Sequence, residues 1–194
     1  MPKDYSLSVT PPTEITQAKY ACDDDWIRDF FQHAQVGHVA TSWDDQPFVT
    51  PILFWYDPQR HEIYFHTNVT GRLGANLERQ DKVCVEASRM GRLLPANTAM
   101  GFALQYESVV AFGRGRLIND DDEKRRALYG LIGKYFPGMT PGVHYRPIVD
   151  EELTQTAVYA ITIESWSGKR NWKARGKQSP DWPPLGEEWF KEGN

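Results

Sequence analysis

The stretch IYFHTNVTGRLGANL, residues 63–77, changes from one sequence period to another partway along. Its first residues, 63–67, are rich in β-branched and aromatic side chains, as in a strand. Leu73 and Leu77 are then four residues apart, as on one face of a helix. The stretch therefore predicts a strand-to-helix junction. Such a junction is either an ordinary turn or a place where backbone N–H groups and the Arg72 cation bind an anion.

Three consecutive strands and a preceding helix are expected on the N-terminal side of the junction. The strand candidates are GHVATSW (37–43), PFVTPILFWY (47–56) and HEIYFHT (61–67). The linking sequences DDQ and DPQR favour turns, so these runs predict antiparallel hairpins. Apolar residues recur at helical spacing from Trp26 to Ala34, behind three aspartates, which predicts a short amphipathic helix.

The chain beyond the junction alternates between strands and one long helix. VCVEAS (83–88), ESVVAFGRGRLI (107–118) and AVYAITIESW (157–166) have the composition of strands. Residues 120–136 predict a helix, because acidic residues precede basic ones at its start and KYFPG ends it. Five or six antiparallel strands with two to three flanking helices predict an α+β fold built on a β-barrel.

The chain length fits one large domain with tails, since domains commonly hold about 100–200 residues and this chain has 194. We expect an extended N-terminal arm over residues 1–20, a single folded domain over 21–168 and a C-terminal tail over 169–194. The 22 Lys and Arg residues are scattered and the net charge is −4, which argues against nucleic acid as a partner. No apolar run suits a membrane span or a signal peptide, so we expect a cytoplasmic protein and no membrane partner.

Two motif-like segments do not support a familiar enzyme class. HEIYFH (61–66) has one residue too many between its histidines for a zinc-protease motif, and no metal is expected there. FGRGRL (112–117) lacks the third glycine of a dinucleotide fingerprint and lies inside a strand candidate. Its glycines instead suit close approach or bending in a barrel strand.

The hairpin and junction ending at residue 77, together with ESVVAFGRGRLINDDDEKRRALYGLIGKYFPG (107–138), resemble the pyridoxamine 5′-phosphate oxidase-like flavoproteins. The branch that includes the nitroimidazole-resistance proteins is the most similar, and the likeness covers roughly residues 37–167. The resemblance implies an FMN-binding split β-barrel that forms a homodimer, with the flavin in a cleft between the two subunits. It therefore makes residues 21–168 an FMN-binding domain.

The resemblance also implies which residues bind the cofactor. TPILF matches the strand whose backbone runs along the flavin ring and ribityl chain, His66 and Thr67 match the end of the next strand, and Gly71 and Arg72 match the phosphate-binding turn. Ser108 matches a polar position that reaches the flavin from the partner subunit. The expected cofactor-binding residues are Thr50, Pro51, Ile52, Leu53, Phe54, His66, Thr67, Gly71, Arg72, Ser108 and Trp172.

Two of these assignments leave alternatives open. Many relatives carry a second basic residue directly after the position of Arg72, and this chain has Leu73 there. Because one cation of the phosphate-binding turn is then missing, a deazaflavin is an alternative to FMN. Trp172 either stacks on the flavin ring from the C-terminal tail, as an indole can, or packs against the barrel.

The resemblance indicates an FMN-dependent oxidoreductase that acts on a small organic substrate by hydride or electron transfer. The flavin carries the chemistry, so no catalytic side chain is assigned. His38, His66, Tyr106 and Trp172 are candidates for lining the substrate side. The alternative is a flavin- or haem-binding carrier or sensor, or a haem-degrading protein, on the same fold. In that case His33, His38 or His144 is the candidate iron ligand.

Overall fold

The computed structural model describes residues 3–190 and has an α+β architecture. The strands are β1 (Ala21–Cys22), β2 (Gly37–Trp43), β3 (Gln46–Ile52), β4 (Trp55–Asp57), β5 (Glu62–Asn68), β6 (Lys82–Leu94), β7 (Ala103–Leu117) and β8 (Thr156–Asn171). The helices are α1 (Asp24–His33), α2 (Arg72–Arg79), α3 (Asp121–Tyr135) and α4 (Asp150–Thr154), with 3-10 turns η1 (Ala18–Tyr20), η2 (Ala99–Gly101) and η3 (Glu187–Phe190).

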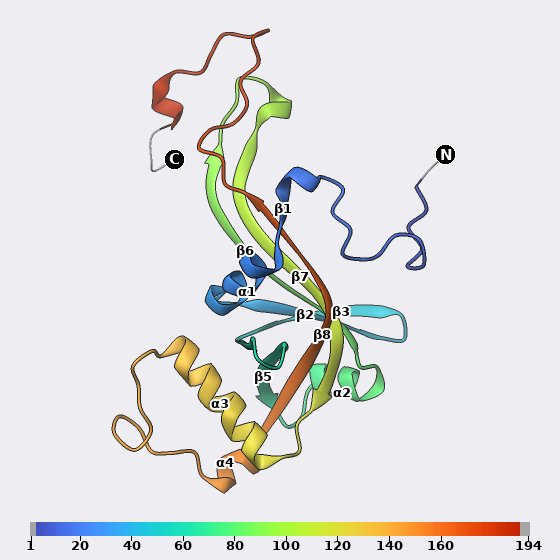
Figure 1. The fold of residues 1–194 in the computed structure, drawn as a ribbon, viewed down its shortest axis with the longest axis vertical. Coiled ribbons are helices and arrows are strands. Elements are labelled where there is room, and N and C mark those ends of the chain that lie inside the picture. The colour runs from blue at the N-terminus through green and yellow to red at the C-terminus, as the bar shows by residue number, and fades with distance from the viewer. Residues whose placement is uncertain (1–2, 191–194) are drawn as a thin grey trace.

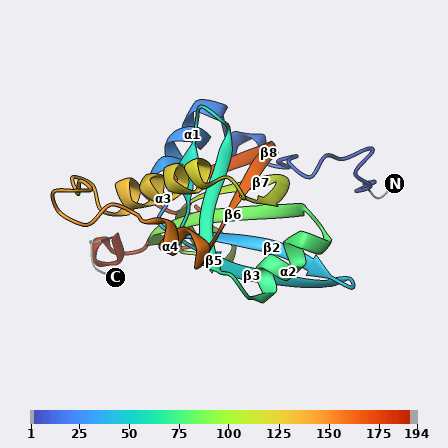
Figure 2. The same ribbon diagram turned by 90° about the horizontal axis from the view of Figure 1, so that it is seen from below.

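One antiparallel sheet contains all the strands and curves into an open barrel. Its order is β3-β2-β6-β7-β8-β5-β4, and β1 adds to β8. In Figure 1, β8 runs through the centre, with α3 across the lower half of the molecule. Figure 2 shows α2 beside the hairpin of β2 and β3, with α1 on the other side of the strands. The expected α+β split barrel with flanking helices is confirmed.

The turn between β2 and β3 explains why the hairpin forms where the sequence predicts it. Asp44 and Asp45 both have left-handed backbone conformations, with φ of 48° and 62°. Two consecutive left-handed residues suit a two-residue hairpin turn whose twist matches that of the strands, and Asp tolerates this conformation better than most side chains. The strand β2 begins and ends where the sequence pattern places it.

The single strand expected over residues 47–56 is wrong, because the chain breaks there into β3 and β4. β3 pairs with β2 and β4 pairs with β5, so the two pieces lie at opposite ends of the sheet. Phe54, between them, donates its N–H to the Tyr135 hydroxyl at 3.0 Å, and the same hydroxyl lies 3.2 Å from the Phe54 carbonyl oxygen. A side chain from α3 therefore replaces strand partners at this point and holds the barrel split.

The main core is formed by the sheet together with α1 and α2. Asp23 caps α1 by accepting a hydrogen bond from the Trp26 N–H at 2.8 Å, as its position before the apolar run predicts. The helix then buries Ile27, Phe30 and Phe31 against the sheet. Phe31 meets the edge of the Phe54 ring, with 5.8 Å between the ring centres. This contact anchors the break between β3 and β4 from the other side.

A buried polar cluster holds α3 on β5. The Tyr64 side chain is fully buried, and its hydroxyl contacts Glu62, Glu123 and Arg126. Arg116 from β7 also binds Glu123, at 2.7 Å. Burial, followed by the hydrogen bond to Glu62, raises the pKa of the Tyr64 phenol. The phenol therefore stays a neutral donor between charged partners.

The long strands β6, β7 and β8 extend beyond the predicted ones and project from the barrel as an arm of the sheet (Figure 1). The C-terminal tail runs beside the tip of the β6–β7 hairpin. Asn97 in that tip donates to the Ser179 carbonyl and accepts from the Ser179 N–H, both at 2.8 Å, and Gln178 donates to the Pro95 carbonyl at 3.1 Å. The tail is thus hydrogen-bonded to the hairpin tip.

Residues 3–17 contain turns and lack regular helix or strand. The short helix α4 was not predicted from the sequence. Over the described part of the chain, the helices are too short or too polar to span a bilayer.

Candidate functional site

The β5–α2 junction presents an open, uncapped helix start. His66 and Thr67 stand near the end of β5, and Gly71 is the cap residue of α2. Gly71 has no side chain to cap the helix, and open space lies where a Cβ would be. The first N–H groups of a helix have no intrahelical partner, so the first turn of α2 offers donors and a favourable dipole to an anion. The backbone here can approach a ligand closely.

Arg72, the first residue of α2, is held over two aromatic rings. Its guanidinium carbon lies 5.1 Å from the centre of the Phe48 ring and 5.7 Å from that of Trp43. Both rings belong to the β2–β3 hairpin, and Thr50 follows Phe48 by two residues, on the same face of β3. Stacking leaves the edge of a guanidinium available for bidentate bonds to a phosphate or carboxylate. Arg72 and Thr50 thus come from one side of the barrel.

A pocket of about 420 Å³ adjoins this junction. Leu53 and His66 line it together with residues of α3 and of the segment before α4. Its walls are mostly apolar. Arg146 also lines it and forms an ion pair with Glu152 at 2.8 Å. Two of the residues expected to bind the cofactor therefore share one cavity.

The side chains of residues 50–54 point in different directions. Ile52 and Phe54 are buried, so their side chains belong to the core. Pro51 is exposed, and Leu53 is 51% exposed. The Phe54 backbone is already hydrogen-bonded to Tyr135. Within this segment, the backbone of Thr50–Leu53 and the side chains of Pro51 and Leu53 are what a ligand can reach.

Ser108 and Trp172 do not lie near the junction within one chain. Thr67 pairs with Ala157 at the start of β8, whereas Ser108 pairs with Lys169, twelve residues further along the same strand. At about 3.3 Å per residue this separation is roughly 40 Å along β8. Trp172 follows the end of that strand. Within one chain, Ser108 and Thr67 therefore pair with opposite ends of β8.

Trp172 takes part in a charged cluster at the far end of the sheet. The Arg89 and Arg170 guanidinium carbons lie 5.2 and 5.9 Å from the centre of its ring. The Nε atoms of both arginines are 2.9 Å from the carboxylate of Glu107, whose side chain is 3% exposed. Glu107 was not predicted as a site residue. Its side chain lies on the same face of β7 as those of the buried Val109 and Ala111, and a charged residue in such a pattern indicates a buried ion pair.

The largest cavity described here, about 700 Å³, lies between α1 and strands β2, β6 and β7. His33, His38, Arg89 and Glu107 line it. His38 Nδ1 lies 3.0 Å from Glu86 Oε2, and because a carboxylate only accepts, Nδ1 is the donor. His33 Nδ1 is 2.8 Å from the Asp29 carbonyl oxygen. His144, by contrast, accepts from the Thr140 N–H at 3.0 Å in the segment after α3. Among residues 3–190 no group of three or more His, Cys, Asp or Glu side chains is placed to hold a metal ion.

Comparisons with known proteins support this view of the fold. Residues 23–170 match the family model described as pyridoxamine 5′-phosphate oxidase. The flavocytochrome Anf3 from Azotobacter vinelandii is 26% identical, with a TM-score of 0.73 over 93% of this chain and 78% of that chain. No curated protein matches the sequence significantly.

Two further solved structures are below 25% identity and show the fold alone. The FAD and heme binding protein from Mycobacterium smegmatis is 23% identical, with a TM-score of 0.71 over 86% of this chain and 76% of that one. A candidate 5-nitroimidazole antibiotic resistance protein from Bacteroides thetaiotaomicron is 22% identical, with a TM-score of 0.66 over 77% of this chain and 86% of that one.

Proposed function

This chain belongs to the pyridoxamine 5′-phosphate oxidase family, and on that premise we propose that it is a flavin-dependent oxidoreductase acting on a small organic molecule. The observation that carries the proposal is the position of Arg72 at the uncapped start of α2, stacked on Phe48 and Trp43. A phosphate dianion is the ligand that such a combination of helix dipole, free N–H groups and guanidinium favours. FMN ends in such a group.

The described residues fit a flavin mononucleotide in the following way. Gly71 and Arg72 would hold the phosphate, with the open backbone at the start of α2 and a cation, and Thr67 near the end of β5 would add a hydroxyl. The strand from Thr50 to Leu53 supplies backbone donors and acceptors along the ring, and His66 stands beside the apolar pocket. When bound, the flavin supplies hydride or electron transfer. The chain's own residues bind and orient the cofactor and exclude water, so none is assigned as a nucleophile or general base.

The proposal includes a homodimer with two flavin sites. Each site takes Arg72 from one subunit and Ser108 and Trp172 from the other, since Ser108 and Trp172 lie at the opposite end of β8 from Thr67 in one chain. A two-fold axis makes this exchange reciprocal, so both sites are completed at once. The rings of Trp172 then serve to cover the flavin and shield it from water.

Purified protein tests the cofactor directly. We expect a yellow protein with absorption bands near the flavin maxima, and a released cofactor whose mass is that of FMN. A mass equal to FAD or a deazaflavin would keep the flavin site but change the ligand. A colourless protein that does not take up FMN, riboflavin or FAD in calorimetry would contradict the proposal.

A second candidate function is supported by the cavity that contains His38. Its Nδ1 donates to Glu86, an arrangement that orients an imidazole and leaves Nε2 as the nitrogen for a metal. The cavity of about 700 Å³ also holds Arg89, which can pair with a carboxylate. This alternative is a carrier or sensor that binds haem, alone or with flavin. It predicts a Soret band on adding haemin, lost in His38→Ala and kept in the matched variant His144→Ala.

A further inference from the structure

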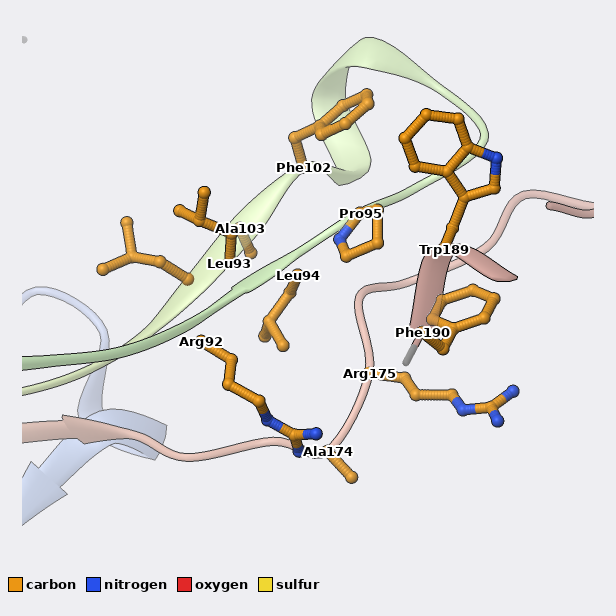
Figure 3. A pocket seen from close by; sticks show the side chains of 11 residues that line it. Arg92, Leu93, Leu94, Pro95, Phe102, Ala103, Ala174, Arg175, Trp189 and Phe190 are labelled. Carbon is orange, nitrogen blue, oxygen red and sulfur yellow. The ribbon is translucent and has the colours of Figure 1, made fainter. Parts of the chain in front are cut away.

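The β6–β7 hairpin tip and the C-terminal tail enclose a pocket of about 430 Å³ that the proposed flavin site does not use. Figure 3 shows Phe102 and Pro95 on the hairpin side, Trp189 and Phe190 on the tail side, and Arg92 reaching toward Ala174. This volume lies in the range of small-molecule sites, roughly 300–1,000 Å³. The hairpin tip and the tail, whose residues line the pocket, lie at the end of the molecule remote from β5 and α2 (Figure 1).

The pocket exposes more large apolar side chains to water than folding requires. Phe102 is 63% exposed, Leu93 61% and Trp189 53%, and all three line this one cavity. Clustered apolar surface with polar groups at its rim marks binding sites more often than scattered exposed residues do. The exposure therefore indicates a ligand that covers these rings.

The walls of the pocket are held in place by hydrogen bonds. Asn97 and Gln178 tie the tail to the hairpin tip, and Gly176 packs so closely on Pro95 that a Cβ there would lie 2.6 Å from its carbonyl oxygen. Arg175 closes the tail on itself, since it binds Glu187 bidentately at 3.0 and 2.8 Å and lies 4.4 Å from the centre of the Phe190 ring. A cavity with fixed walls loses little entropy when a ligand enters.

The charged residues at the pocket favour a ligand that carries a negative charge. Arg92 and Arg175 are the charged residues among those that line it, so within the described residues the lining carries only positive charge. Glu187, the partner of Arg175, stands outside the lining. A carboxylate or sulfonate on a ligand can therefore meet a guanidinium at one end while its rings lie between Phe102 and Trp189.

We propose that this pocket binds a flat, largely apolar organic anion of the aromatic-acid class. The ligand's rings cover Phe102 and Trp189, and its anionic group pairs with Arg175, in competition with Glu187. None of the described residues that line this pocket is among those assigned to the flavin, although Ala174 follows Trp172 by two residues, and the occupancy of the pocket does not depend on the proposed function.

Fluorescence titration of the flavin-loaded protein tests this proposal with 8-anilinonaphthalene-1-sulfonate as the anionic probe and N-phenyl-1-naphthylamine as its neutral counterpart. We expect one saturable site per chain and tighter binding of the anion by about tenfold, the scale of one charge-assisted hydrogen bond. Phe102→Ala and Trp189→Ala should each weaken binding of the anionic probe by roughly 3- to 10-fold. Arg175→Gln should weaken it, and Glu187→Gln, which releases Arg175, should strengthen it.

Trp182→Ala is the matched control, since Trp182 is 66% exposed on the same tail but does not line the pocket. It should leave both affinities unchanged. Equal binding of the two probes, or binding that Phe102→Ala and Trp189→Ala leave intact, would overturn the proposal. A third result would also overturn it: the dimer binds no probe, and Trp189→Ala makes the dimer dissociate. The pocket would then be a subunit interface. None of these results changes the flavin spectrum that tests the proposed function.

Discussion

The Arg89 guanidinium carbon lies 5.2 Å from the centre of the Trp172 ring. The same arginine binds the buried carboxylate of Glu107, so the first residue after β8 is tied to the middle of the sheet. The position of Trp172 is therefore set by β6 and β7 and not by a free tail. Trp172 follows the end of β8, whereas Thr67, before the start of α2, pairs with the beginning of that strand.

Trp172→Ala should raise the fluorescence of the bound flavin and weaken FMN binding by about 0.5–1.5 kcal/mol, the excess typical of an aromatic pair. The indole shields the flavin ring and quenches its emission, so its removal has both effects. Trp182→Ala is the control and should change neither. Trp166 is partly buried against Phe31, with its Nε1 donating to Asp24 at 2.8 Å, so Trp166→Ala should instead lower the free energy of unfolding, by up to about 3 kcal/mol. Unchanged emission in Trp172→Ala would remove Trp172 from the flavin site.

Arg72→Ala should weaken FMN binding by about 1.5–3 kcal/mol, the value of a hydrogen bond to a charged group. Riboflavin has no phosphate, so its affinity should fall far less. Calorimetry with both ligands makes the comparison. Arg79→Ala is the control, because Arg79 also stacks on Trp43, at 4.5 Å, but lies at the other end of α2. Equal losses for FMN and riboflavin would move Arg72 away from the phosphate.

A mixed dimer of Arg72→Ala and Trp172→Ala subunits should keep one tight FMN site. If each site takes Arg72 from one subunit and Trp172 from the other, one site of the mixed dimer lacks both residues and the other lacks neither. Two different affinity tags allow this dimer to be isolated and titrated. Two weakened sites and no tight one would show that both residues act within one chain, and a monomer holding one FMN in light scattering would exclude the shared site.

Lys134 should make stability rise with pH above neutrality. Burial lowers its pKa from 10.5 to about 8 in the folded protein, while its Nζ donates to the Phe31 carbonyl at 3.2 Å. Below about pH 8 both states carry the proton, and between pH 8 and 10.5 the unfolded chain binds more protons, so the free energy of unfolding increases with pH. Because the side chain is partly exposed, we expect a rise of roughly 1–2 kcal/mol.

Lys134→Met should remove that rise in the free energy of unfolding. Urea unfolding curves of the variant and the parent, recorded at several pH values, measure the difference. Lys124→Met is the matched control, since Lys124 also lies on α3 and donates to a carbonyl, that of Leu153, at 3.2 Å. A rise that persists in Lys134→Met would assign it to other groups.

Tyr64→Phe should lower the free energy of unfolding by about 1–3 kcal/mol, because Glu62 and Arg126 lose a buried partner while no volume is lost. Denaturant unfolding measures the change, and Tyr5→Phe, at a residue 70% exposed, is the control. An unchanged midpoint would mean that Arg116 and Thr162 satisfy Glu62 without the phenol.

Much of the fold was predictable from the sequence because its signals are local. Asp23 and Asp120 start helices by accepting hydrogen bonds from N–H groups three residues later, and the Asp44–Asp45 turn sets the register of its hairpin. The change of period near Gly71 gave the start of α2 correctly. In each case the deciding groups are only a few residues apart, so no knowledge of the rest of the fold is needed.

The break at Phe54 was not predictable in this way. Residues 47–56 have the composition of one strand, and the hydroxyl that ends it comes from Tyr135, 81 residues later. Glu107 likewise has its partners on β6 and β8, at positions that only the strand register brings beside it. Contacts between distant segments depend on packing and register, which a local pattern does not contain.

The sequence by itself determined most of the strands, the starts of α1, α2 and α3, and the family, and it predicts an anion site at the β5–α2 junction, because these follow from residue type and spacing. Only the tertiary structure decided that Trp172 and Ser108 lie at the opposite end of β8 from Thr67, and that the tail forms a pocket with the hairpin tip. The physical reason is the register of the sheet: pairing holds Thr67 and Ser108 against Ala157 and Lys169, which are twelve residues or roughly 40 Å apart along β8.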